Sequence, residues 1–399
     1  MSERYLFNRL EVAGSFGDLG ALLPISIGMI MLNGLDPFGI LFSVGIFYLL
    51  AGIYYGVTVP VQPMKVISAY ALTMAISPAE IAASALLMAC CLLFMGATGL
   101  INHIQRLVPK QVVRGVQLAT GTLLMAEGVR FVIGTSSYQL AQNASEPYLR
   151  IESLFSLPIG IIIGSISAII TLLFLANKKA PAGLIVIFFG LITGIFFGTY
   201  QGISDIKITI NTPEFLPFGF PTSADFSLAF LMLVLPQLPM TIGNAVVANA
   251  DLSRQYFAEK SEKVTTKALC LSMGLANLLC FFIGGMPLCH GAGGLASHYA
   301  FGARSAGSNL IIGSIFVLLA ILLGKHAVSL LQLIPFSALG VLLFFAGSQL
   351  ALTIMDMKHR KEFFVIFAML GITLVSNLAI AFGIGIALAR LLKSDKLTI

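Results

Sequence analysis

Two proline-punctuated segments hold most of the side chains in this sequence that could bind a ligand. They are PVQPMK at residues 60–65 and PLCHGA at residues 287–292, which lie 227 positions apart. The first carries the amide of Gln62 and the ammonium of Lys65, and the second carries the imidazole of His290 next to a glycine. These groups donate hydrogen bonds, and glycine lets a ligand come close to backbone N–H groups. The residue types therefore favour binding of a small anion.

Each segment leads into an apolar stretch that is too short to cross a membrane. About thirteen helix-competent residues follow, at 64–76 and 291–303. A helix of that length spans roughly 20 Å, whereas the hydrocarbon core is roughly 30 Å thick. Short interrupted segments at corresponding places in two halves of a chain indicate the substrate site of a carrier. We therefore expect two half-helices that begin inside the membrane and line one site.

The composition is that of a polytopic membrane protein. Of 399 residues, 58% are hydrophobic and 10% are charged, so little of the chain remains for a soluble domain. The net charge of +6 is spread over short loops, which is typical of membrane topology and not of nucleic-acid binding. The five cysteines fall in apolar segments and predict no disulfide framework. No nucleophile and base set, phosphate loop or metal site stands out, so we predict neither an enzyme nor a cofactor.

Hydropathy predicts fourteen membrane segments, counting the two half-helices. They lie near residues 11–33, 38–57, 64–76, 78–101, 111–134, 153–176, 181–199, 226–250, 265–285, 291–303, 307–324, 335–355, 362–376 and 378–392. With the N-terminus in the cytoplasm, eighteen of the 23 lysines and arginines fall on the cytoplasmic side, in accord with the positive-inside rule. We therefore expect a multi-pass protein of a bacterial cytoplasmic (inner) membrane, with both termini in the cytoplasm.

The segments divide into two sets of seven around a polar loop at residues 200–225. Because seven is odd, two related halves must have opposite orientations, which gives an inverted repeat. The offset of 227 positions aligns Met64 with Gly291 and Asp18 with Ala245, which is next to Asn244. The segments around Asp18 and Asn244 are both interrupted by glycine or proline, which persists at membrane depth only where the backbone is buried in protein or faces water. We expect segments 1, 3, 8 and 10 to line one central site.

Two half-helices that face each other would bring unpaired N–H groups and partial positive charge to the space between them. Such a pocket favours an anion. The predicted substrate-binding residues are Gln62, Met64, Lys65, Gln237, Asn244, His290, Gly291, Ala292 and Gly293. His290 begins a helix, where the dipole disfavours its protonation, so we expect a neutral hydrogen-bond donor. Cys289, His290 and His298 lack the usual spacings of a zinc site.

Asp18 is costly at membrane depth, which marks it as a functional candidate. It could titrate as the coupling site for a proton or cation, or it could pair with Lys65. A carboxylate that faced an anionic substrate directly would repel it. Lys65 could instead extend to the membrane interface, and the glycine-rich stretch at residues 290–294 could instead be a close contact between helices.

Three motifs carry a resemblance to a known family. GDLG at residues 17–20, PVQPMK at residues 60–65 and PLCHGAGGLASHYAFGARS at residues 287–305 are similar to signatures of the molybdate transporter family, a relative of the sulfate permeases. The resemblance extends over essentially the whole chain. It implies an all-α fold of fourteen segments shared with the uracil permeases, in which a short extended strand precedes each half-helix. Substrate would lie between the half-helices and move with a core domain against a gate domain, as in an elevator.

The resemblance also implies how the two domains alternate along the chain. The expected divisions are a first core part at residues 1–104, a first gate part at 105–200, an extracytoplasmic linker at 201–225, a second core part at 226–325 and a second gate part at 326–399. Related carriers often pair, so a homodimer stays open as an alternative to a monomer.

We predict a secondary active transporter that imports a tetrahedral oxyanion, molybdate or sulfate, across the lipid bilayer. Proton symport is the expected coupling, because a dianion that enters against a negative-inside potential costs about 2.3 kcal/mol per charge per 100 mV. Two alternatives stay open at this point: a nucleobase or organic-acid carrier on the same fold, and a passive anion channel.

Overall fold

The protein is built almost entirely from helices. The computed structural model describes residues 4–101, 109–154, 156–175, 182–200 and 208–393, together with positions 177 and 206. The predicted domain boundary between residues 104 and 105 lies outside the described residues, as does the start of the predicted linker at residues 201–205.

The elements of the two halves follow one another in a similar order. The N-terminal half contains α1 (Arg9–Ser15), α2 (Leu19–Met31), α3 (Pro37–Tyr55), β1 (Gln62–Pro63), α4 (Lys65–Met74), α5 (Pro78–Thr98), α7 (Lys110–Ile133), α8 (Ser137–Ala141), β2 (Ser153–Leu154), β3 (Leu157–Pro158), α9 (Ile159–Phe174) and α10 (Ala182–Phe197). The C-terminal half contains α11 (Ser223–Leu228), η1 (Ala229–Val234), α12 (Leu235–Met240), η2 (Thr241–Ala248), α13 (Asn249–Phe257), η3 (Ala258–Ser261), α14 (Thr266–Ile283), β4 (Leu288–Cys289), α15 (Ala292–Ala300), α16 (Gly307–Leu323), η4 (Gly324–His326), α17 (Ala327–Leu331), α18 (Phe336–Ala351), η5 (Leu352–Asp356), α19 (Arg360–Val375) and α20 (Leu378–Leu391).

Each of the fourteen predicted segments contains helix in this structure. Among the described residues, eight helical segments are long and apolar enough to cross a membrane by themselves. The chain is therefore an integral multi-pass membrane protein of mostly helical class. The count of fourteen crossings stays a prediction.

Three predicted segments differ from expectation in their details. The half-helices α4 and α15 contain 10 and 9 residues, which is shorter than the predicted thirteen. The predicted interruption of segment 8 is wrong, because residues 223–261 are helical throughout. Pro236 and Pro239 are instead accommodated by the π-helical segments η1 and η2 on either side of α12. A π-helix has a wider turn, which redistributes the hydrogen bonds that a proline removes. Segment 1, by contrast, is interrupted between α1 and α2 as predicted.

Close packing of α7 against α18 depends on glycines in both helices. A Cβ atom on Gly128 would lie 2.4 Å from the carbonyl oxygen of Gly340, and one on Gly340 would lie 2.5 Å from that of Gly128. Gly121 and Gly347 form a second reciprocal pair, about two helical turns away. Small residues let helix backbones approach closely where apolar burial gives little drive for association in lipid. These pairs make α7 and α18 one tightly packed unit.

Helix ends are fixed by local sequence signals. Asp36 caps α3 by accepting a hydrogen bond of 2.9 Å from the N–H of Gly39, and α3 ends at Gly56, where φ is +74°. Ser77 and Glu80 form a capping box at the start of α5. Such signals set where each helix starts and stops, and so where the connecting strands begin.

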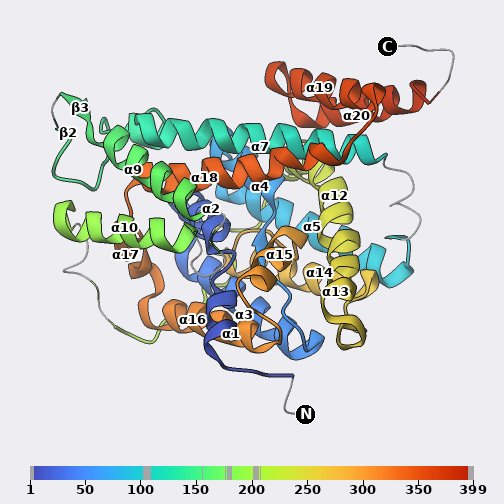
Figure 1. The fold of residues 1–399 in the computed structure, drawn as a ribbon, viewed down its shortest axis with the longest axis horizontal. Coiled ribbons are helices and arrows are strands. Elements are labelled where there is room, and N and C mark those ends of the chain that lie inside the picture. Colours follow the sequence, from blue (N-terminus) through green and yellow to red (C-terminus); the bar gives the residue numbers. More distant parts are fainter. Residues whose placement is uncertain are drawn as a thin grey trace.

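The half-helices lie in the middle of the molecule. In Figure 1 the pair α7 and α18 runs along the upper part and the pair α3 and α16 along the lower part, with α4 and α15 between them. Buried side chains from most elements form one large apolar core around this region. The fold therefore holds the two short helices inside protein and not against lipid.

Candidate functional site

The two half-helices meet at a short antiparallel ribbon. Strand β1 pairs with β4, with Gln62 opposite Cys289 and Pro63 opposite Leu288. The N–H of Met64 extends the ribbon by donating to the carbonyl of Pro287 at 2.9 Å. Because α4 follows β1 directly and α15 follows β4 directly, the N-termini of both half-helices lie beside the ribbon. The ribbon thus brings together two predicted motifs that are far apart in sequence.

Two buried asparagines hold the extended chain in place. Asn277 of α14 bonds to both the N–H and the carbonyl of Leu288, at 3.1 and 2.8 Å. Asn309 of α16 does the same to Val59, at 3.2 and 2.7 Å. Each side-chain amide therefore replaces the neighbouring strand that these short segments lack. Lone asparagines in apolar helices gave no sequence signal strong enough to predict this role.

His290 lies inside the protein, with its ring turned away from open space. It is 0% exposed, its Nδ1 donates to the carbonyl of Pro60 at 2.8 Å, and its Nε2 lies 3.1 Å from the hydroxyl of Ser272. The ring also packs against Phe47, at 4.4 Å between centroids. Both nitrogens are therefore engaged with protein. The carbonyl of His290 accepts a hydrogen bond of 2.8 Å from Asn249, which fixes the entry to α15.

At the first junction, the protein itself occupies part of the helix N-terminus. The side-chain oxygen of Gln237 accepts from the N–H groups of Val66 and Ile67, at 2.9 and 3.3 Å. The Gln237 amide nitrogen donates to Thr241 at 2.9 Å. Of the first turn of α4, only the N–H of Lys65 is without a partner in the described chain. The structure thus places Gln237 as a cap on α4.

At the second junction, the helix N-terminus is not capped. Gly291 is the N-cap residue of α15 and makes no side-chain hydrogen bond. Neither the N–H of Ala292 nor that of Gly293 has a hydrogen-bond partner within the described chain. Gly293 is exposed, and a Cβ atom placed on it would meet nothing within 4 Å. The first turn of α15 is therefore open, and the side-chain amide of Asn244 approaches it, 3.4 Å from the Cβ position of Gly291.

Asp18 lies at the break between α1 and α2, against the first turn of α15. Its Oδ1 accepts a hydrogen bond of 2.8 Å from the Gln62 amide nitrogen. Its Oδ2 is buried without a partner in the described chain and lies 2.8 Å from the Cβ position of Gly294. Lys65 is half-buried and close enough to attract the carboxylate, yet no ion pair joins the two within the described residues.

The structure therefore brings the predicted residues to one region but gives them different surroundings. Lys65, Asn244, Ala292 and Gly293 keep groups without hydrogen-bond partners in the described chain. The N–H of Met64 belongs to the ribbon. An open helix N-terminus with a nearby ammonium and amide can hold an anion by hydrogen bonds and by the helix dipole.

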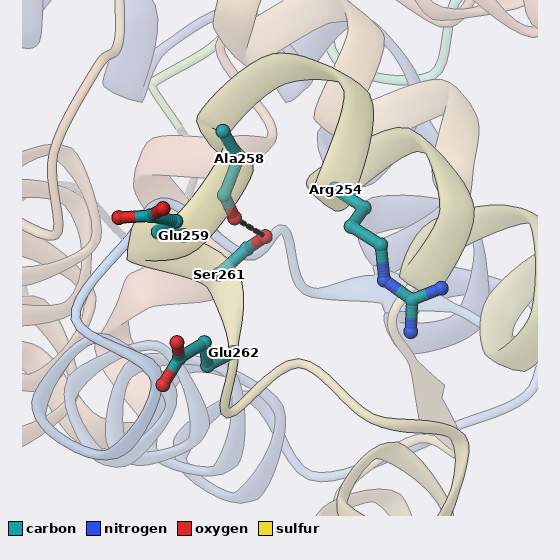
Figure 2. A pocket seen from close by; sticks show the side chains of 5 residues that line it. All are labelled: Arg254, Ala258, Glu259, Ser261 and Glu262. Carbon is teal, nitrogen blue, oxygen red and sulfur yellow. Dashed lines mark hydrogen bonds between the residues drawn. The ribbon is translucent and has the colours of Figure 1, made fainter.

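A separate surface pocket lies outside this region. Its volume is about 490 Å³, and it is lined by Arg254, Ala258, Glu259, Ser261 and Glu262. Figure 2 shows the arginine on one side of the pocket and the two glutamates on the other. Mixed charges at the joint between α13 and α14 are typical of a solvated loop, and none of the predicted site residues lines it.

Comparisons with known proteins agree on the class of this chain. Residues 10–124 and 229–350 match the family model described as a molybdate transporter of the MFS superfamily. Molybdate transporter 2 of Arabidopsis thaliana is 30% identical, and the match covers 96% of this chain and 87% of the relative. Molybdate transporter 1 of Arabidopsis thaliana is 29% identical, with 94% and 86% covered.

Two solved structures share the fold. The transmembrane domain of a cyanobacterium bicarbonate transporter, BicA, has a TM-score of 0.66 at 16% identity, over 95% of this chain and 98% of that one. The murine anion transporter Slc26a9 has a TM-score of 0.69 at 14% identity, over 98% of this chain and 69% of that one. With the family match, they identify an anion transporter and not an enzyme. The chain belongs to the molybdate transporter family.

Proposed function

We propose that this transporter imports a tetrahedral oxyanion, molybdate in the first place with sulfate as the competing dianion, and that the anion binds at the N-terminus of α15. The observation that carries the proposal is the open first turn of α15, where the N–H groups of Ala292 and Gly293 have no partner in the described chain. Ala292 is buried, and buried N–H groups almost always have a hydrogen-bond partner. An anion at this position supplies one.

Another helix in the protein shows what such an anion does. The carboxylate of Glu146 accepts from the N–H groups of Phe336 and Ser337 at the start of α18, both at 2.8 Å. At α18 a carboxylate of the chain accepts from the first N–H groups of the helix, whereas at α15 no carboxylate of the described chain accepts from the N–H groups of Ala292 and Gly293. An oxyanion with several acceptor oxygens would take at α15 the place that Glu146 takes at α18.

The remaining site residues divide into two roles in this proposal. Lys65 and Asn244 contribute a charge and a hydrogen-bond donor to the anion. Gln237 and His290 are positioning residues, because their polar atoms are bonded to α4 and to the chain around Pro60. Both sets are needed, since a preorganised site loses less entropy when it binds.

The proposed architecture is a fourteen-crossing inverted repeat of seven plus seven. Packing supports it: α3 lies against α16, and the equivalent pair in exchanged halves, α14 against α5, is also in close contact. The antiparallel ribbon of β1 and β4 is the arrangement expected at a two-fold axis in the membrane plane. Both termini lie in the cytoplasm in this topology, in accord with the positive-inside rule.

The proposed mechanism is an elevator. The core domain comprises residues 1–104 and 226–325, and it moves against a gate domain of residues 105–200 and 326–399. Helix α2 of the core touches α10 of the gate through glycine, because a Cβ atom on Gly183 would lie 2.7 Å from the Cα of Gly20. Small residues at this position let the two backbones approach closely, so this contact would form part of the surface between the two proposed domains.

Uptake by purified protein in liposomes tests the proposal. With an inward proton gradient, radiolabelled molybdate should accumulate above its external concentration even against a membrane potential that is negative inside. Collapse of the proton gradient should abolish this accumulation. Excess sulfate should compete, whereas uracil and dicarboxylates should not. Competition by uracil or a dicarboxylate alone would favour a nucleobase or organic-acid carrier, and current without uphill accumulation would indicate a channel.

A further inference from the structure

The contact between Gln62 and Asp18 leaves two buried oxygens without partners. In the described chain, Gln62 Oε1 and Asp18 Oδ2 both lack a hydrogen bond, although Gln62 is 1% and Asp18 is 6% exposed. One N–H of the Gln62 amide nitrogen donates to Asp18 Oδ1, at 2.8 Å. Buried polar atoms without partners are rare and call for an explanation in each case.

The orientation of the Gln62 amide is set by the charge on Asp18. A carboxylate accepts hydrogen bonds and donates none, so it draws the Gln62 nitrogen toward itself. The Gln62 oxygen is then turned to Gly291, where it lies 1.8 Å from the Cβ position. This oxygen faces the N-terminus of α15, the place proposed for the anion. An acceptor atom there repels an oxyanion.

We propose that protonation of Asp18 makes the side-chain amide of Gln62 rotate by half a turn, so that Gln62 presents a hydrogen-bond donor to the anion in place of an acceptor. One proton from solvent binds to the Asp18 carboxylate. The new O–H donates to Gln62 Oε1, and the Gln62 nitrogen, released from Asp18, donates to the anion at α15. No covalent bond other than the O–H bond forms, and proton and anion bind together.

This inference rests on the proposed function. It names Gln62 as the residue that couples proton binding at Asp18 to anion binding at α15. The turned amide satisfies Gln62 Oε1 and adds a donor to the site, whereas proton binding alone would only remove a negative charge. The groups around Asp18 fit this switch. The ammonium of Lys65, the phenol of Tyr48 and the thiol of Cys289 lie close enough to interact with it electrostatically.

Other elements packed around α2 add few ionisable groups. Helices α10 and α18 contain none. Helix α15 contributes His298, whose Nδ1 lies 2.9 Å from the hydroxyl of Thr58, and Tyr299, which stacks on Tyr256 at 3.9 Å between centroids. Helix α1, which packs against α15, carries the buried Glu11, but both of its oxygens accept backbone hydrogen bonds, at 2.8 and 3.2 Å. Asp18 keeps an oxygen without a partner in the described chain, so we assign the coupled proton to Asp18.

The test measures molybdate affinity of the purified protein between pH 5 and pH 8. For wild type, one linked proton should tighten binding up to about tenfold for each pH unit of acidification. Gln62→Met keeps the size of the side chain and leaves Asp18 intact, and its affinity should change less than about twofold over the same range. Gln62→Met that retains the full pH dependence would show that Asp18 acts by charge alone and would overturn the proposal.

The variant Asp18→Asn tests the same proposal independently. Its amide can donate to Gln62 Oε1 as the protonated acid would, so this variant should bind at all pH values about as tightly as wild type does at pH 5. Binding weaker than that of wild type at pH 8, or an unchanged pH dependence, would overturn the proposal. The result for Asp18→Asn can be interpreted even if Gln62→Met does not bind molybdate.

A control and a separate outcome complete the design. Gln139→Met removes another buried glutamine, whose nitrogen donates to the carbonyl of Phe131 at 3.0 Å, and it should leave the pH dependence of binding unchanged. If wild type binds neither molybdate, tungstate nor sulfate at any pH, the proposed function itself fails. If wild type binds but the Gln62 and Asp18 variants behave otherwise than expected, only the amide switch fails.

Discussion

The two half-helix junctions are alike in backbone and unlike in chemistry. Both follow a two-residue strand of the same ribbon, but α4 is capped by Gln237 and carries Lys65, whereas α15 starts with glycines and open N–H groups. The two helix N-termini are therefore not equivalent as anion-binding sites. In the proposed site, the junction at α15 therefore provides backbone hydrogen bonds to the ligand. The junction at α4 provides the charge of Lys65 and a helix end that Gln237 holds in place.

The largest effect is expected at the open junction. In Gly291→Ala, the added methyl group would lie 1.8 Å from Gln62 Oε1. The methyl group would displace the Gln62 amide and narrow the space at the start of α15 where the anion binds, so molybdate affinity should fall about 100-fold, or about 2.7 kcal/mol. Equilibrium binding to purified protein measures this. Gly371→Ala is the matched control, because its Cβ meets nothing within 4 Å. Wild-type affinity in Gly291→Ala would remove α15 from the site.

Glu146 offers a comparison with a helix whose anion is built in. Burial raises the pKa of Glu146 from its usual 4.5 to about 7, opposed by hydrogen bonds from Ser337 and Phe336. Because the pKa is raised in the folded state, the associated stability is fully present below pH 4.5 and is lost as the pH rises through 7. The loss is on the order of 3 kcal/mol.

Thermal unfolding in detergent tests this pH dependence. The melting temperature of wild type should fall between pH 5 and pH 8 by more than that of Glu146→Gln, which cannot ionise. Equal slopes for the two proteins would show that the carboxylate at α18 does not titrate in this range.

Lys65→Ala should produce the next effect, at the charged junction. A hydrogen bond to a charged group contributes about 2 kcal/mol, so affinity for molybdate should fall roughly 30-fold. Lys325→Ala is a suitable control, since Lys325 pairs with Glu214 on the surface at 3.0 Å. Calorimetric titration of both variants distinguishes the alternatives: unchanged affinity in Lys65→Ala would reduce that lysine to a structural role.

The smallest effect separates two amides of the same helical segment. Gln237→Leu removes the cap of α4, so it should cost about 1 kcal/mol of stability and change molybdate affinity less than about threefold. Asn244→Leu removes a donor near Gly291, so affinity should fall about tenfold for a hydrogen bond of about 1.4 kcal/mol. The reverse order of affinities would assign Gln237 to the ligand and Asn244 to the scaffold.

Sequence reasoning found the elements of the site because their signals are local. Proline on either side of Gln62 and glycines after His290 mark an extended chain that enters a short helix, and apolar segments of sufficient length mark the other helices. The positions of α4 and α15 were therefore predictable to within a few residues. Asp18 was identifiable from the cost of a carboxylate in an apolar segment.

Long-range pairing was not predictable in the same way. Nothing local to Gln237 indicates that it caps α4, 171 positions earlier in the chain, and nothing near Asn277 or Asn309 indicates that they bind the extended segments. The π-helical turns of segment 8 also depend on tertiary context, because the same prolines could have broken the helix. One polar side chain in an apolar helix shows that a partner exists but not which one.

The most direct test of the account is the position of a bound tungstate, a heavy tetrahedral analogue whose anomalous scattering locates it in a crystal. We predict one site with oxygens within about 3.2 Å of the N–H groups of Ala292 and Gly293, near Lys65 and Asn244. Tungstate bound only in the surface pocket of Arg254, or at α4 with the first turn of α15 left empty, would contradict the account.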